Sequence, residues 1–135
     1  MTTLDLRAPS IKIKFDKGKD LTPIFYYLGP NNEVIDLSSY SARMQAKYTY
    51  TQSVPTLTLD TLLLGGLAIV TGTATLDDGS TVAGAYGVQL LITDTQTAAL
   101  TSNTPLLFDI ELVSGTEVVY PFMKGTLIPY EEVTV

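Results

Sequence analysis

The amino-acid sequence predicts an antiparallel β-sandwich, a domain of two sheets packed face to face. Short segments in which apolar and polar residues alternate recur along the chain, and turn-forming residues separate them at roughly ten-residue intervals. Charged residues make up only 16% of the chain, while Thr, Tyr, Val and Ile are abundant, which favours strands over solvated helices. The 135 residues suffice to bury one core. We therefore expect an arm over 1–9 and a single β-sandwich domain over 10–135.

The arm is expected from its pattern. Leu4 and Leu6 alternate with charged residues that include Arg7, and Pro9 then interrupts the alternation. Such a segment can add a strand to an exposed sheet edge. The pattern does not decide whether that sheet edge belongs to the same domain or to a neighbouring subunit.

Residues 10–15 predict the first strand of the domain. Its Ile and Phe side chains point to one face, and Lys12 and Lys14 point to the other, where lysines commonly guard an exposed edge. A turn follows at 16–20. Its Lys-Gly-Lys sequence lacks the spacing and the following helix of a P-loop, so we expect no phosphate site there.

The next segments predict a second strand, a turn and a long central strand. Residues 21–28 form the second strand, with Pro23 near its start, where a missing donor is tolerated. Residues 29–33 form the turn. From Ser41 the chain alternates again, as expected for a half-buried strand. The inward face of this strand consists of Ala42, Met44, Ala46, Tyr48 and Tyr50.

Residues 51–93 contain no Lys or Arg and predict several short strands. The Asp-Asp-Gly-Ser sequence at 77–80 resembles the start of a calcium loop, but the EF-hand spacing is absent, so we expect a hairpin turn. For the small residues of 81–87 we expect an ordered loop rather than a strand. The expected strands are 56–60, 67–70, 73–76 and 88–93.

Residues 94–100 predict one short helix that crosses between the sheets at one end of the sandwich. Thr93, Asp94 or Thr95 can cap its start, and Pro105 follows its end. The side chains expected against the core are Ala98, Ala99 and Leu100.

The last two strands predict a hairpin that sets the register of one sheet. Asp109 and Glu111 fall on one face, so a slip of one residue would bury both carboxylates. The turn lies at 114–117, where we expect Gly115 to supply a positive φ, and 118–128 return as the partner strand. The opposite, inward face of the first strand consists of Leu106, Phe108, Ile110 and Leu112.

The composition argues against enzyme chemistry. The chain has no Cys and no His, which excludes disulfides, Cys-ligated zinc and the Ser-His-Asp and Cys-His mechanisms. Two carboxylate pairs, Asp77 with Asp78 and Asp109 with Glu111, each lie on one element, whereas glycosidase carboxylates flank a cleft. We therefore expect no catalytic residues, no metal and no cofactor.

The charge distribution bears on the partners. The net charge of −6 argues against a binder of duplex nucleic acid, and we expect no nucleic-acid partner. Residues 1–47 carry +2 and residues 48–135 carry −8. This asymmetry either forms a polar axis suited to head-to-tail contacts or solvates exposed strand faces. No apolar run is long enough to span a bilayer, and the start of the chain is unlike a secretion signal, so we expect no membrane partner and synthesis in a cytoplasm.

The tyrosines allow two interpretations. They either form a stacking platform for a sugar or a single-stranded nucleic acid, or pack on the sheet faces with the hydroxyl at the rim. The mixed charge around them and the lack of Trp favour packing. The residues concerned are Tyr26, Tyr27, Tyr40, Tyr48 and Tyr50.

Four segments resemble, in matching order, a widespread group of small tailed-bacteriophage proteins. They are VIDLSSYSARMQAKY, TLTLD, LLITDTQTAALTSNTPLLFDIELVSG and VVYPFMKGTLIPYEEVT, and the likeness covers 34–60 and 88–135. The group is similar to the immunoglobulin-like amino-terminal domain of baseplate upper proteins. Residues 61–87 are longer than the group leads us to expect, and we expect this insertion to be fitted to one particular neighbour.

The resemblance implies a structural virion protein that is made in the host cytoplasm and assembles in the tail, baseplate or fibre-attachment region. It implies other virion proteins as partners, a homo-oligomer within the particle, contact through sheet edges and the arm, and no catalytic residues. A capsid decoration protein is the alternative within this class, and a carbohydrate-binding module is the alternative from another class. The candidate contacts are Leu4, Leu6, Arg7, Lys12, Lys14, Tyr48 and Tyr50.

Overall fold

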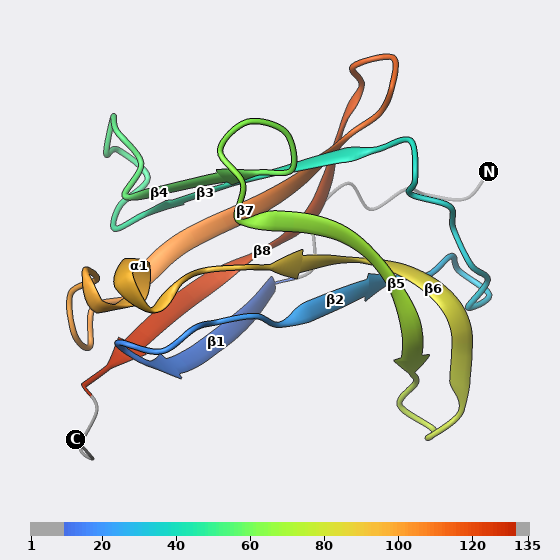
Figure 1. Cartoon of the computed structure of the whole chain (residues 1–135), viewed down its shortest axis with the longest axis horizontal. Coiled ribbons are helices and arrows are strands. Elements are labelled where there is room, and N and C mark those ends of the chain that lie inside the picture. Colours follow the sequence, from blue (N-terminus) through green and yellow to red (C-terminus); the bar gives the residue numbers. More distant parts are fainter. Residues whose placement is uncertain (1–9, 132–135) are drawn as a thin grey trace.

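The computed structural model describes residues 10–131 and confirms the β-sandwich: two sheets pack against each other and one short helix joins them (Figure 1). The strands are β1 (Ser10–Asp16), β2 (Ile24–Tyr27), β3 (Ser41–Lys47), β4 (Leu57–Asp60), β5 (Leu67–Thr75), β6 (Thr81–Leu90), β7 (Leu106–Val113) and β8 (Val119–Tyr130), and the helix is α1 (Asp94–Ala98).

The strand order is that of an immunoglobulin-like sandwich. One sheet has the order β1-β8-β7-β3-β4 and the other β2-β6-β5. These orders correspond to the G-F-C and B-E-D arrangements of that fold, with β4 as the added strand beside C. All strand pairs are antiparallel except β1 with β8, which is parallel. Parallel neighbours need a long connection, and here the rest of the domain supplies it.

The core lies between the inward faces of β3, β7 and β6. Phe108 is only 4% exposed and Ile110 is fully buried, as their alternation predicts. Met44 on β3 and Val88 on β6 pack into the same cluster from the two sheets. Asp109 is exposed on the outward face. The predicted register of the last hairpin is therefore confirmed, apart from an irregularity in β8 opposite Ile110.

The expectation of a loop at 81–87 is wrong. These residues belong to the ten-residue strand β6, and the two short strands expected before them form one strand, β5. Small residues serve close packing here: a Cβ at Gly87 would lie 2.7 Å from the Phe25 carbonyl oxygen, and one at Gly72 would meet the Tyr26 hydroxyl. Glycine within a strand commonly marks such an approach.

The positive φ of the β7–β8 turn lies at Glu117, not at Gly115 as expected. Glu117 has φ 64°, while Gly115 is not among the glycines with positive φ. Ser114 donates its backbone N–H to Val118 O at 2.9 Å, and Glu117 donates to Ser114 O at 2.9 Å. The loop between β7 and β8 covers 114–118 and is therefore one residue longer than the turn predicted at 114–117. Glu117, in the left-handed region, closes this loop shortly before the return strand.

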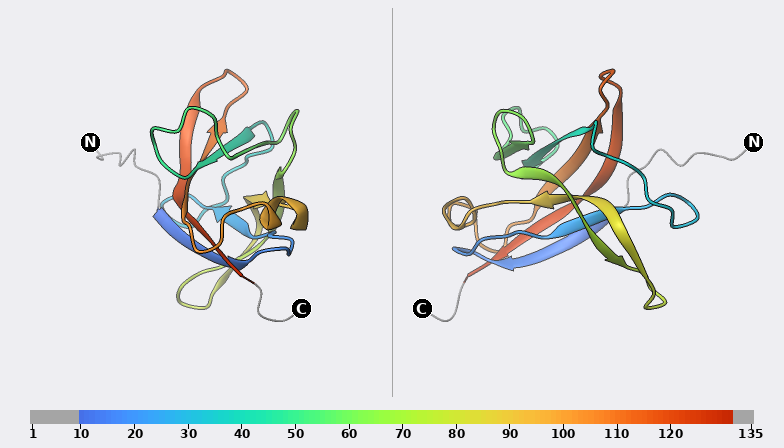
Figure 2. Two further views of the ribbon diagram at one scale, coloured as in Figure 1. Left: turned by 90° about the vertical axis from the view of Figure 1, so that its left-hand side faces the viewer. Right: turned by 45° about the vertical axis from the view of Figure 1, so that its right-hand side comes forward.

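The helix α1 begins where it is expected and ends earlier. Thr93 is the N-cap and forms a capping box with Gln96, whose backbone N–H it accepts at 3.2 Å. Leu100 is buried as predicted, but Ala98 and Ala99 are exposed and Thr97 is buried in their place. Figure 2 shows α1 at one end of the molecule, where the chain passes from β6 to β7.

Candidate docking surfaces

The candidate contacts predicted from the sequence do not form one site. Lys12 and Lys14 lie exposed on the outward face of β1. Two strands, β8 and β7, separate them from β3 and the tyrosines that follow it. The remaining candidates, Leu4, Leu6 and Arg7, lie outside the described residues.

Tyr48 and Tyr50 have different environments. Tyr48 is half-buried against the core, and its hydroxyl accepts a hydrogen bond from the backbone N–H of Thr101 at 2.9 Å. It therefore packs the sheet with its hydroxyl at the rim. Tyr50 is 82% exposed, so its ring is available to a partner.

Tyr50 borders a small groove of about 150 Å³ on the outward face of the five-stranded sheet. Gln45, Lys47, Asp109 and Lys124 also line it. Although Asp109 is largely exposed, its partial burial raises the pKa of its carboxyl, and the negative charge of Glu111 raises it further, while Lys47 and Arg43 act in the opposite direction. The groove thus combines one exposed aromatic ring with polar groups of both signs.

Basic and acidic side chains alternate between strands on this face. Arg43 on β3 forms an ion pair with Glu111 on β7 at 3.2 Å, and Asp109 lies opposite Lys124 in the β7–β8 register. Cross-strand pairs of opposite charge stabilise a sheet modestly. On this face the charged side chains pair between strands or lie in solvent. This favours the interpretation that the charges of the sequence solvate exposed strand faces over the interpretation that they form a polar axis.

Three consecutive leucines protrude from the loop between β4 and β5, the green loop above β5 in Figure 1. Leu62 is 76% exposed, Leu63 92% and Leu64 63%. Leu91 is also exposed, and its backbone N–H donates to Gly66 O at the base of the loop. We call Leu62–Leu64 the leucine loop. Sequence reasoning missed it, although an uninterrupted apolar triplet before Gly65 was a visible signal.

The leucine loop is held in one conformation by polar contacts beneath it. The Asp60 Oδ1 atom accepts the backbone N–H groups of Leu62, Leu63 and Leu64 at 3.1, 2.8 and 2.8 Å. Burial acts to raise the pKa of Asp60, but these hydrogen bonds outweigh it and hold the pKa below its ordinary value. Thr61 N–H donates to Ala42 O at 3.0 Å and ties the loop to β3.

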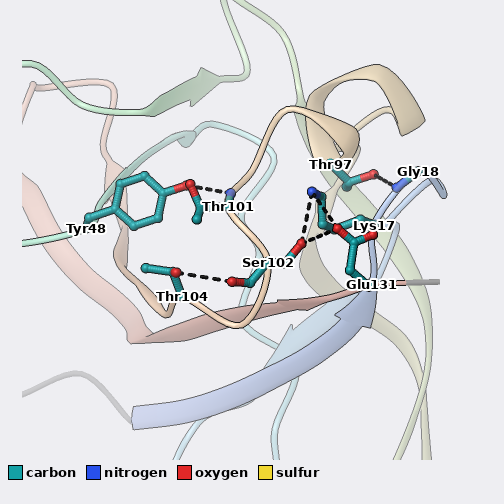
Figure 3. A network of polar contacts seen from close by, with 8 residues as sticks. All are labelled: Lys17, Gly18, Tyr48, Thr97, Thr101, Ser102, Thr104 and Glu131. Carbon is teal, nitrogen blue, oxygen red and sulfur yellow. Dashed lines mark hydrogen bonds and ion pairs between the residues drawn. The ribbon is translucent and has the colours of Figure 1, made fainter. Parts of the chain in front are cut away.

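A polar cluster fastens the helical end of the sandwich (Figure 3). Lys17 donates to the Ser102 hydroxyl at 3.2 Å and forms an ion pair with Glu131 at 3.5 Å. The Thr97 hydroxyl accepts the Gly18 N–H at 3.0 Å. These contacts join the β1–β2 turn, the segment after α1 and the end of β8.

The Lys17–Ser102 pair is arranged as a structural contact. A lysine activates a serine when its amine accepts the hydroxyl proton. Ser102 instead donates to the Glu131 carboxylate and accepts from Lys17. The hydrogen bond from Ser102, and then the charge of Lys17, lower the pKa of Glu131, as expected for a paired carboxylate.

The Asp-Asp-Gly-Ser sequence forms the predicted turn. The Asp78 carboxylate accepts the Ser80 backbone N–H at 2.9 Å and also the Ser80 hydroxyl, and both bonds lower the pKa of Asp78. Gly79 has φ 86°. Within residues 10–131, no three acidic side chains gather as a metal site would require. No helix in that range is long and apolar enough to span a membrane.

A hollow of about 640 Å³ opens between β2, β8 and the tip of the β5–β6 hairpin. Phe25, Leu28 and Met123 contribute apolar surface to it, while Asp77 and Asp78 lie at its rim. Figure 2 shows the hairpin curling away from the body of the sandwich at this end. The ten-residue β6 is longer than the four-residue β2, a feature that the assignment of 81–87 as a loop concealed.

No model of a known protein family matches the chain, and a search of the curated proteins finds no significant match.

Proposed function

We propose that the chain is a structural protein of a tailed-bacteriophage virion that docks on other virion proteins in the tail, baseplate or fibre-attachment region. The resemblance of 34–60 and 88–135 to small tailed-phage proteins supports the virion setting. The observation that carries the docking role is the leucine loop. A run of exposed apolar residues on a folded domain is disfavoured unless another surface covers it.

The leucine loop suits docking because its conformation is fixed before binding. Asp60 already holds the backbone of all three leucines, so little ordering entropy is lost when a partner covers them. The loop lies within 61–87, the segment that the resemblance identifies as an insertion. Repetition of the protein in a particle would let such modest contacts sum.

Purified particles test the proposal. Mass spectrometry should detect the protein at a regular copy number, and electron cryo-microscopy should place its density below the portal. Density on the hexon faces would identify a capsid decoration protein instead. Particles that lack the protein altogether would contradict the virion role.

Carbohydrate binding is a second candidate, and one observation favours it. The exposed ring of Tyr50 borders a groove whose lining combines apolar surface with the polar groups of Gln45 and Asp109, an arrangement that suits stacking on a sugar. If this candidate holds, a glycan array should give a signal that Tyr50→Ala abolishes. A second variant in the groove, Gln45→Ala, tests whether the polar part of the groove contributes. A folded wild-type protein that binds no glycan would discard the candidate.

A further inference from the structure

The strand β5 lies at the border of the three-stranded sheet and has a long free edge. Within residues 10–131 it pairs along one edge only, with β6. An isolated bridge joins Gly66 to Asp60 just before the strand begins, and no described strand pairs with that edge further along. Figure 2 shows the β5–β6 hairpin curling away from the body of the sandwich, which leaves the later part of this edge at the surface.

The other three edge strands of the two described sheets are protected in ways that β5 is not. Natural proteins protect a sheet edge with charged side chains, with Pro or by keeping the strand short. The edge strand β1 carries Lys12 and Lys14. The strands β2 and β4 have four residues each, and Pro23 precedes β2 while Asp60 ends β4. In contrast, β5 has nine residues, and the segment 61–76 that includes it contains no charged residue and no Pro.

Alternate residues of β5 direct their backbone groups to the free edge. Leu91 donates its N–H to Gly66 O at 2.8 Å, so the carbonyl of Gly66 faces the strand β6 that Leu91 follows. The register is regular over the first six residues of β5, and backbone groups along an antiparallel ladder alternate in direction. The N–H and C=O groups of Ile69 and Thr71 therefore point away from β6, while those of Val70 point toward it.

Two copies of this edge are complementary to each other. In an antiparallel pair, a strand meets its own sequence reversed, so outward N–H groups of each copy can lie opposite outward C=O groups of the other. Because 61–76 is uncharged, the paired edges bring no like charges together, although the whole chain carries −6. The side chains of Thr71, Thr73 and Thr75 are exposed along β5, and pairs of Thr across two strands are favourable.

We propose that two copies of the chain pair through their β5 edges, antiparallel and about a two-fold axis. The two three-stranded sheets then form one continuous sheet with the order β2-β6-β5-β5-β6-β2. Because each copy has one β5 edge, the association closes at two chains. The assignment is independent of the proposed virion role, since two purified copies of the chain suffice for it.

The mass of the purified full chain in solution tests the proposal, measured by sedimentation equilibrium over a dilution series. The mass should rise with concentration from that of one chain to that of two. Thr71→Pro removes an outward N–H that β6 does not use, so the fold should persist while the association weakens roughly tenfold or more. The mass of one chain at every concentration, or growth beyond two chains, would overturn the proposal.

A second substitution keeps the test decisive if the Pro variant fails to fold. Thr71→Lys retains the backbone N–H and places a lysine on the edge, as protected edges do, so it should also weaken the association. Thr58→Lys is the matched control, because it adds the same charge at an exposed position of the edge strand β4. It should associate as the wild type does. Equal association of Thr71→Lys and the wild type would overturn the proposal.

Hydrogen exchange measured by NMR locates the contact within the dimer. Between dilute and concentrated protein, exchange at the amides of Ile69 and Thr71 should slow roughly tenfold or more, since each gains a hydrogen bond. The amide of Val70, which faces β6, should change much less. A dimer in which Ile69 and Thr71 exchange at the monomer rate would be joined through another surface, such as the leucine loops, and would overturn the proposal.

Discussion

Asp109 shows how a single carboxylate sets a pH dependence. Burial and the neighbouring Glu111 raise its pKa above the ordinary value of 3.8, so the folded state holds this proton more tightly than the unfolded state. Between 3.8 and the raised pKa, the folded state therefore binds more protons, and stability falls as pH rises. Asp109→Asn should remove this fall and be more stable than the wild type at pH 7. Urea melts from pH 3 to 7 check this, and parallel curves for the two proteins would contradict it.

Phe108 tests the assignment of the core. Its side chain is 4% exposed and packs in the central cluster. Phe108→Ala should lower the free energy of unfolding by about 3–5 kcal/mol, as large core truncations do. Leu107→Ala, at the neighbouring half-buried and outward position, serves as the control and should cost clearly less. A loss below about 1 kcal/mol for Phe108→Ala in urea melts would refute its place in the core.

At the scale of elements, α1 is fastened to the β1–β2 turn by the Thr97 hydroxyl and by the Asp20 carboxylate, which accepts the Asp94 N–H at 2.7 Å. Thr97 is fully buried, donates to Lys19 O at 2.8 Å and accepts the Gly18 N–H at 3.0 Å. Thr97→Val keeps the shape but leaves both backbone groups without this partner, which should cost about 1–3 kcal/mol. Thr97→Ser retains the hydroxyl and should cost less. Equal stabilities of the two variants in thermal melts would show that the hydroxyl is dispensable.

The parallel pairing of β1 with β8 depends on a glycine. A Cβ at Gly125 would lie 2.0 Å from the Ile11 carbonyl oxygen, so Gly125→Ala should push β1 away from β8. We expect it to lower the free energy of unfolding by roughly 1–3 kcal/mol, as overpacked sites do. Gly115→Ala is the control: its Cβ would have only Ser39 O nearby, at 3.9 Å, and should be near neutral. Chemical denaturation of both variants checks the contrast, which a large loss in Gly115→Ala would contradict.

At the scale of the whole molecule, the alternating segments predicted the architecture well. The inward rows of β3 and β7, the helix that joins the sheets and the Asp-Asp-Gly-Ser turn all follow from side-chain period and capping chemistry, which are local properties. The prediction missed the strand at 81–87 because its small residues look flexible in isolation. They become strand residues only when Tyr26 packs across Gly72 and Gly87 from a distant segment.

The candidate docking surfaces were less predictable than the fold. Alternation placed Tyr48 and Tyr50 on one face, but β3 ends at Lys47, so only Tyr48 follows the strand into the core and Tyr50 projects from the next loop. The leucine loop was missed because an apolar triplet suggests a buried segment. Its exposure depends on Asp60, whose carboxylate turns the chain outward at the end of β4.

In the proposed function, a rigid β-sandwich docks on other virion proteins through a preformed apolar loop. Incorporation of a loop variant into particles tests this claim most directly. Wild-type protein and Leu63→Asp would be co-expressed during infection with distinguishable mass labels, and Val54→Asp, at another exposed apolar site, would serve as the control.

The ratio of variant to wild-type protein in purified particles is the quantity to measure. Because the charge would have to be buried against the partner, the account predicts that Leu63→Asp is depleted roughly tenfold or more, although it folds, and that Val54→Asp is not. Equal incorporation of Leu63→Asp and the wild type would contradict the account.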